Sequence, residues 1–138
     1  MKGEKPRRII FLGLIVLSLT LSGCAFLVAA GVGAGAAVGT MEYVKGELKQ
    51  AYAASMEKAW NASLAVVEAM NMKVTEKSID NLDQNRRILG QTTDKKDFQI
   101  TLESLGKDVT MVKVRVGLFG DEAASKRIHE AIAQNLRK

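Results

Sequence analysis

Two sets of apolar residues in the C-terminal half of the chain alternate strictly with polar neighbours. They are Phe98, Ile100 and Leu102, followed by Val112, Val114 and Val116. A period of two places every second side chain on the same side of a strand, and the other side stays wet. The pattern therefore predicts two half-buried strands, and Gly106 and Asp108 predict the turn between them.

Two other segments repeat apolar residues at helical spacing. Ser55 is a suitable N-cap for a helix that runs to about Asn71. Gly120 and Asp121 end the last strand and cap a second helix. The apolar stripe of this second helix repeats every four residues, at Ala124, Ile128, Ile132 and Leu136.

Three further segments read as strands. The first spans 44–52, with Val44, Leu48 and Tyr52 on one face; the others span 72–80 and 86–92, on either side of a polar loop. The expected order is β-α-β-β-β-β-α. This order predicts an α+β two-layer sandwich, with a mostly antiparallel sheet and both helices on one face.

The N-terminal segment has the organisation of a secretory signal. Met1–Arg8 is basic, and Ile9–Leu21 is an apolar run of 13 residues, shorter than the roughly 20 that cross a bilayer. This basic region has a net charge of +3 out of the +5 of the whole chain, so the remainder has only +2. A mixed-sign remainder gives no reason to expect a nucleic-acid partner.

The quartet Leu21-Ser22-Gly23-Cys24 that closes this segment resembles the lipobox of bacterial lipoproteins. The resemblance implies cleavage between Gly23 and Cys24 and a lipid on Cys24, the only cysteine of the chain. Residues 1–23 would then be a removed signal peptide, 24–41 a lipid-anchored Gly/Ala-rich tether and 42–138 a periplasmic domain. Because Ala25 differs from the aspartate of the inner-membrane retention signal, the resemblance implies the outer membrane. The alternative is an uncleaved anchor in the inner membrane.

Glycines follow the cysteine at a spacing of four residues, at Gly31, Gly35 and Gly39. No βαβ unit surrounds them, so a dinucleotide-binding loop is not expected. We favour a flexible or surface-associated tether, because glycine disfavours the helix, or else a membrane-associated helix. The alternative is a membrane helix that associates through its glycine stripe.

A basic surface is predicted on the sheet face that the helices leave open. Alternation with the buried valines sends Lys113 and Arg115 to that face, and Lys73, Lys77 and Arg87 join them if their strands keep the register that hides Val74 and Ile88. Such a surface would suit an anionic envelope partner, such as lipid headgroups, lipopolysaccharide or peptidoglycan carboxylates. The alternative, which we favour, is a solvated face without a partner, because lysines on open strands also prevent edge pairing.

Residues typical of catalysis or metal binding are scarce. His129 is the only histidine, and we expect it on the surface, one residue away from the apolar stripe of its helix. No metal site is expected, because zinc would need further His or Cys ligands, and no cofactor is expected. Two carboxylate pairs, Asp80 with Asp83 and Asp94 with Asp97, are interpreted as caps of turns. Trp60 is expected in the core, and we predict no enzymatic activity.

Four stretches of the chain resemble the small bacterial lipoproteins of the domain of unknown function 3568 family. They are "YVKGELKQAY", "ASMEKAW", "GKDVTMVKVRVGLFGD" and "ASKRIHEAI". The resemblance implies an envelope lipoprotein and supplies no activity. We therefore expect a structural or interaction module with its membrane contact through the lipid. The alternative is a small-ligand or lipid-binding lipoprotein, which a cavity beside Trp60 would favour. The oligomeric state is left open.

Overall fold

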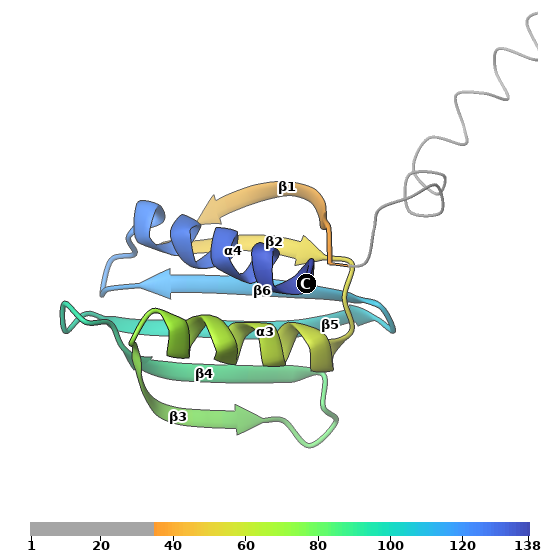
Figure 1. Cartoon of the computed structure of the whole chain (residues 1–138), viewed down its shortest axis with the longest axis horizontal. Coiled ribbons are helices and arrows are strands. Elements are labelled where there is room, and N and C mark those ends of the chain that lie inside the picture. Colours follow the sequence, from red (N-terminus) through yellow and green to blue (C-terminus); the bar gives the residue numbers. More distant parts are fainter. Residues whose placement is uncertain (1–34) are drawn as a thin grey trace, which may run out of the picture. The chain divides into compact units, whose positions relative to one another are not determined.

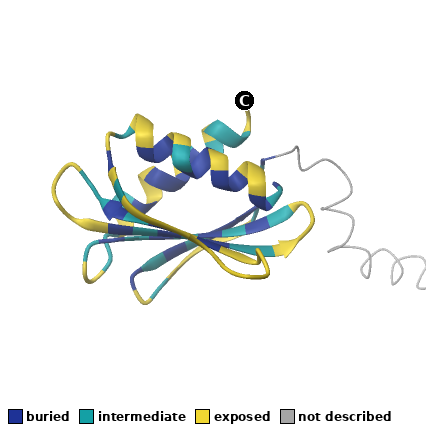
Figure 2. Cartoon of the chain, turned by 90° about the horizontal axis from the view of Figure 1, so that it is seen from below, coloured by how far each residue is buried: buried dark blue, intermediate teal, exposed yellow. Residues whose placement is uncertain are grey.

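One antiparallel sheet of six strands carries two helices on one of its faces (Figures 1 and 2). The computed structural model describes residues 35–138. The strands follow the order β1-β2-β6-β5-β4-β3 across the sheet. The elements are β1 (Ala37–Val44), β2 (Glu47–Tyr52), α3 (Met56–Ala69), β3 (Lys73–Ile79), β4 (Asn85–Gln91), β5 (Asp97–Gly106), β6 (Val109–Val116) and α4 (Glu122–Leu136). The predicted fold class, an α+β two-layer sandwich, is confirmed.

The connection through α3 accounts for the strand order. Helix α3 connects β2 to the far edge of the sheet, from which β3, β4, β5 and β6 return as a meander until β6 pairs with β2 (Figure 1). Helix α4 then packs on β2 and β6, beside α3. Both predicted caps are present: Ser55 Oγ accepts from the backbone N–H of Lys58 at 3.3 Å, and Asp121 Oδ1 accepts from that of Ala124 at 2.9 Å.

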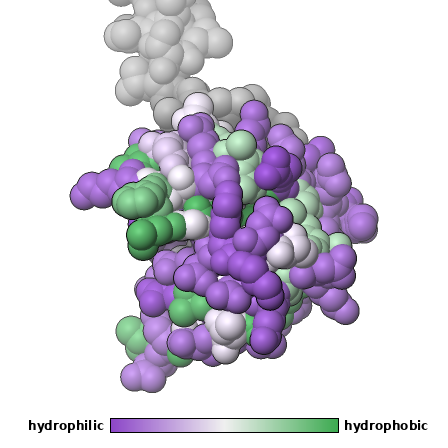
Figure 3. All heavy atoms as spheres, turned by 90° about the vertical axis from the view of Figure 1, so that its left-hand side faces the viewer, coloured by the Kyte–Doolittle hydropathy of each residue, from purple (hydrophilic) through white to green (hydrophobic). Residues whose placement is uncertain are grey.

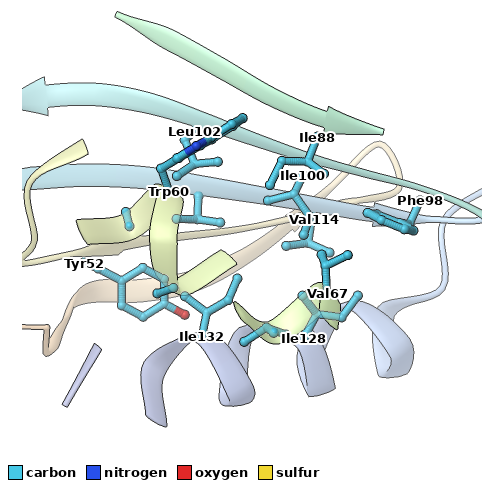
Figure 4. Close-up of a cluster of buried hydrophobic side chains, with 14 of the residues drawn as sticks. Tyr52, Trp60, Val67, Ile88, Phe98, Ile100, Leu102, Val114, Ile128 and Ile132 are labelled. Carbon is cyan, nitrogen blue, oxygen red and sulfur yellow. The ribbon is translucent and has the colours of Figure 1, made fainter. Parts of the chain in front are cut away.

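The core lies between the sheet and the helices (Figure 4). The predicted alternation holds on both central strands, because the two apolar sets named above are buried and their polar neighbours are not. Trp60 is in this core, as expected, and only 8% of its surface is exposed. The strand side chains that face the helices include Leu48, Tyr52, Ile88, Phe98, Ile100, Leu102, Val112, Val114 and Val116.

The first predicted strand is wrong at its start. Residues 44–52 are not one strand, because the chain reverses at Lys45 and Gly46, whose φ angles are +52° and +84°. Two consecutive residues with positive φ are typical of the tight two-residue turn that joins antiparallel strands. The sheet therefore has six strands instead of five.

The additional strand, β1, occupies part of the predicted tether. Gly39 lies within β1 and Gly35 lies just before it, so neither belongs to a glycine-zipper helix, and that alternative is wrong for these two residues. Residues 37–41 are likewise part of the sheet and not of a tether. Gly35 is tightly packed, because a Cβ there would lie 2.4 Å from the carbonyl oxygen of Leu136. Gly31 lies outside the described residues.

Candidate functional site

The predicted lipidation and cleavage positions, Cys24 and Gly23, lie outside the described residues. Among residues 35–138, neither helix has the length and apolar character that a membrane span requires. The described chain begins at Gly35, at the end of the sheet where β1 starts and β2 ends, since Ala37 pairs with Tyr52.

Most of the predicted basic surface lies on the open face of the sheet. Lys113 is directly opposite Thr101, which is opposite Arg87, so these side chains share one row across β6, β5 and β4. Lys49, which was not among the predicted cations, extends this row onto β2 opposite Lys113. Arg115 lies one row away, opposite Gln99.

Edge strand β3 departs from the predicted register. Its pairing with β4 shifts between Val74 and Glu76, a β-bulge that places Lys77 directly opposite the buried Ile88. Because directly opposed residues point to the same side of a sheet, Lys77 belongs to the helix-bearing side and its inclusion in the basic surface is wrong. Lys73 precedes the bulge and stays on the open side, opposite Gln91.

Acidic residues are interleaved with these cations. Lys113 Nζ lies 2.6 Å from Glu103 Oε2, and Glu42 is directly opposite Lys49. Gln91 on β4 is directly opposite both Lys73 on β3 and Asp97 on β5, so one strand separates Asp97 from Lys73. The open face therefore carries charges of both signs side by side, and its cations are partly neutralised within the sheet.

His129 is fully buried, which contradicts the predicted surface position. Its Nε2 lies 2.8 Å from the carbonyl oxygen of Leu48 on β2, and its Nδ1 lies 2.9 Å from the Tyr52 hydroxyl. A carbonyl oxygen only accepts, so Nε2 carries the hydrogen and Nδ1 is free to accept from Tyr52. The neutral imidazole is thus fully satisfied and joins α4 to β2.

Burial changes the acid–base properties of this pair. It lowers the pKa of His129 below its ordinary value, and the hydrogen bond to Leu48 only partly offsets this effect. Burial also raises the pKa of Tyr52.

The predicted surface position of His129 was wrong because the buried stripe of α4 is two positions wide, with Ser125 and His129 beside Ala124 and Ile128. A helix that packs on a sheet buries a face wider than a single row of residues four apart. This rule could have predicted from the sequence that His129, next to Ile128, is buried.

Arg86 forms a second polar cluster, under the N-terminus of α3. Its guanidinium binds Asp83 through two hydrogen bonds, at 2.7 and 2.9 Å, and Glu57 through a third, at 2.9 Å. It also lies 5.6 Å from the ring centroid of Trp60. The hydrogen bonds from the guanidinium lower the pKa of Asp83. The same bonds to Asp83, and the one to Glu57, raise the pKa of Arg86. No local sequence pattern indicates this cluster.

The predicted carboxylate pairs lie in or beside turns, and Asp97 is the first residue of β5. Asp80 accepts hydrogen bonds from Gln84 N and Asn85 Nδ2, at 2.8 and 2.9 Å, and the bond from Asn85 is the main reason that the pKa of Asp80 is lowered. Asp97 accepts from Gln91 Nε2 at 3.1 Å. Within residues 35–138, no group of three or more His, Cys, Asp or Glu side chains is placed to hold a metal ion.

Several hollows indent the surface of the described domain. One of about 450 Å³ opens on the sheet beside Leu89, Gln99, Arg115 and Leu118. Another of about 220 Å³ lies between β1 and α4 and is lined by Tyr52 and His129, among others. Trp60 lines neither of these two hollows, so neither of them supports the predicted alternative of a ligand site beside Trp60.

Two of the three most exposed large apolar side chains in residues 35–138 belong to the loop between β6 and α4. Leu118 is 77% exposed and Phe119 is 87% exposed. Figure 3 looks onto this end of the molecule, where apolar side chains gather in one part of a mostly polar surface. Gly120 fixes the loop against the β1–β2 turn, because a Cβ on it would lie 2.4 Å from the Cα of Gly46. This loop was not among the predicted functional positions.

Comparison with known proteins gives one assignment. None of the curated proteins matches the chain. A family model described as "Protein of unknown function (DUF3568)" matches residues 8–135, nearly the whole length. The chain therefore belongs to the DUF3568 family.

Proposed function

We propose that the protein is a bacterial envelope lipoprotein that holds its α+β domain at the periplasmic face of the outer membrane, as a structural or interaction module without catalytic activity. The observation that carries this proposal is Leu21-Ser22-Gly23-Cys24 at the end of an apolar run of signal-peptide length. The family match supports it, because the match starts at residue 8 and includes both the apolar run and Cys24.

The position of the first strand adds a distance to this proposal. Strand β1 begins at Ala37, 13 residues after Cys24. At 3.3–3.6 Å per extended residue, the lipid would keep the domain within about 45 Å of its attachment point. The domain would therefore act close to the membrane surface.

Attachment is tested by exchanging the cysteine. Cys24→Ser should abolish incorporation of labelled palmitate and leave an uncleaved precursor, because the thiol is the acyl acceptor. Gly31→Ser introduces the same side chain outside the quartet and should be labelled like the wild type. Equal labelling of Cys24→Ser and the wild type would refute the assignment.

The membrane is tested separately at the next position. In an enterobacterial host, Ala25→Asp should move the labelled protein from the outer to the inner membrane fraction. Ala25→Ser is the matched control and should leave the distribution unchanged. Wild-type protein found in the inner membrane would refute the outer-membrane location while leaving the lipid attachment standing.

A further inference from the structure

Strand β1 is attached to the domain by its backbone more than by its side chains. Six of its eight residues are exposed and none is buried. The pairing with β2 is interrupted between Val38 and Glu42, where β1 bows away from its neighbour (Figure 1). One side-chain contact is the hydrogen bond from Gln50 Nε2 to the carbonyl oxygen of Val38, at 3.0 Å. A β1 strand from another copy of the chain would offer β2 the same groups.

The turn that joins β1 to β2 has only two residues, and one of them is strained. Lys45 has a φ of +52°, a conformation that residues with a side chain rarely adopt. If Lys45 and Gly46 became extended, residues 37–52 would form one long strand. The sequence pattern of residues 44–52 is itself typical of one continuous strand through this turn. Short strained hinges are typical of proteins that exchange an element between copies.

Exposed apolar side chains lie around this hinge. Phe119 contacts it directly, since a Cβ on Gly46 would lie 2.7 Å from the Phe119 carbonyl oxygen. Leu118 and Phe119 are largely exposed, and Tyr43, at the end of β1, is 38% exposed. Exposed apolar groups of this kind are often covered by a partner. A partner that met the domain at the hinge would cover this loop.

We propose that two copies of the chain exchange their β1 strands, so that β1 of each copy pairs with β2 of the other. The exchanged dimer keeps every β1–β2 hydrogen bond, relieves the turn at Lys45 and brings the hinge ends of the two domains together. The apolar loop of Leu118 and Phe119 lies at that junction and is covered there. A second copy is the favoured occupant because it alone supplies the identical strand. The proposal rests on residues 35–138 and is independent of lipid attachment at Cys24.

The exchange is tested with one cysteine on each of two full-length chains. Glu42 and Lys49 are directly opposite each other on β1 and β2, and opposed strand residues lie within the distance that a disulfide bridges. Chains with Glu42→Cys and chains with Lys49→Cys, distinguished by tags, are produced in the same cells. Exchange predicts a disulfide between positions 42 and 49 of different chains, identified by mass spectrometry of the linked peptides.

Two controls define the outcome. Chains with Ser78→Cys, on the opposite edge strand, produced together with chains with Lys49→Cys, should give no link between these positions. Cys24 is present in every chain, so its own reactions are the same in all samples. A single chain with both Glu42→Cys and Lys49→Cys reports whether the pair can form at all. If this chain forms the disulfide internally while the two-chain experiment yields none, the exchange is refuted.

The apolar loop gives an independent readout. Phe119→Asp should lower the yield of linked dimer by about tenfold, because the junction would bury an unpaired carboxylate. Leu82→Asp is the matched control: Leu82 is 80% exposed in the β3–β4 loop at the other end of the sheet, and its replacement should leave the yield unchanged. Equal effects of the two substitutions would overturn the assigned junction.

The hinge supplies the last test. Gly46→Val strains the closed turn and should raise the linked fraction. Lys45→Asn tolerates positive φ and should lower it. The opposite order would show that the turn does not control the exchange.

Discussion

Arg86 and His129 each tie one helix to the sheet, the first as a cation and the second as a neutral ring. The Arg86 side chain is about 9% exposed, but its partners Asp83 and Glu57 reach into solvent, with 54% and 65% of their side chains exposed. His129 and its partner Tyr52 are both buried completely or nearly so. The charged group is thus placed where water still reaches its counterions, whereas the fully dry position has a neutral group that satisfies its hydrogen bonds within the protein.

This difference predicts that the two helices depend on different conditions. The Arg86 cluster should respond to salt, because part of its stabilisation is electrostatic and its partners are exposed. The His129 pair should be indifferent to salt and sensitive to pH, because burial opposes protonation of the ring.

The largest effect is expected from His129→Ala. It should lower the free energy of unfolding by about 3–4 kcal/mol, because it leaves a cavity and removes the imidazole that donates to the Leu48 carbonyl and accepts from the Tyr52 hydroxyl. The hydroxyl then keeps only the backbone oxygen of residue 129, at 3.2 Å. Urea unfolding of the full chain in detergent measures the change. Glu130→Ala alters the exposed neighbour and should change stability by less than about 0.5 kcal/mol. Equal stabilities of the two variants would show that the buried pair does not hold α4.

A smaller loss is expected from Arg86→Met. The substitution keeps much of the buried aliphatic volume but removes the hydrogen bonds to Asp83 and Glu57 and the contact with Trp60. We expect a loss of about 2 kcal/mol, which shrinks in 0.5 M salt. Arg87→Met, on the open face of the same strand, is the matched control and should have little effect. A salt-independent loss would contradict the electrostatic part of the comparison.

Tyr52→Phe tests the His129 pair by changing its partner on the sheet. It keeps the ring and removes only the hydroxyl, which leaves the Nδ1 of His129 without a donor. A loss of about 1.5 kcal/mol is expected in the wild type, and a smaller one in the His129→Ala background, because the hydroxyl has no imidazole partner there. Additive losses would mean that the two side chains act independently.

The sequence was sufficient for the parts of the fold that depend on periodicity. Regular alternation along β5 and β6 and the apolar stripe of α4 identified the core faces, and Ser55 and Asp121 identified the helix starts. The hairpin at Lys45 and Gly46 was missed because apolar residues on both sides of it continue the pattern of a single strand. Only the turn residues themselves distinguish the two cases.

Tertiary contacts determined what the sequence could not show. The bulge that moves Lys77 to the other side begins at Val74, opposite Gly90 of the neighbouring strand, where a Cβ would lie 2.2 Å from the Lys73 carbonyl oxygen. The partner of His129 is 77 residues away in the chain, and Glu57 is 29 residues from Arg86. No local pattern reports such pairs. The interleaved acids of the open face likewise became apparent only from the strand register.

The smallest expected effect is the dependence of stability on pH. Burial lowers the pKa of His129 in the folded protein, whereas the unfolded chain binds a proton with a pKa near 6.5. Between these two values the unfolded state binds more protons, so the stability present at neutral pH is lost as the pH falls through about 6.5. One group changes stability by at most about 1.4 kcal/mol per pH unit, so a loss smaller than this limit is expected between pH 6.5 and 5.5. His129→Gln keeps a donor for Leu48 and an acceptor for Tyr52 but cannot titrate, so its stability should be flat over this range. A wild-type profile as flat as that of His129→Gln would show that the ring can be protonated in place and that the neutral link between α4 and β2 is not required.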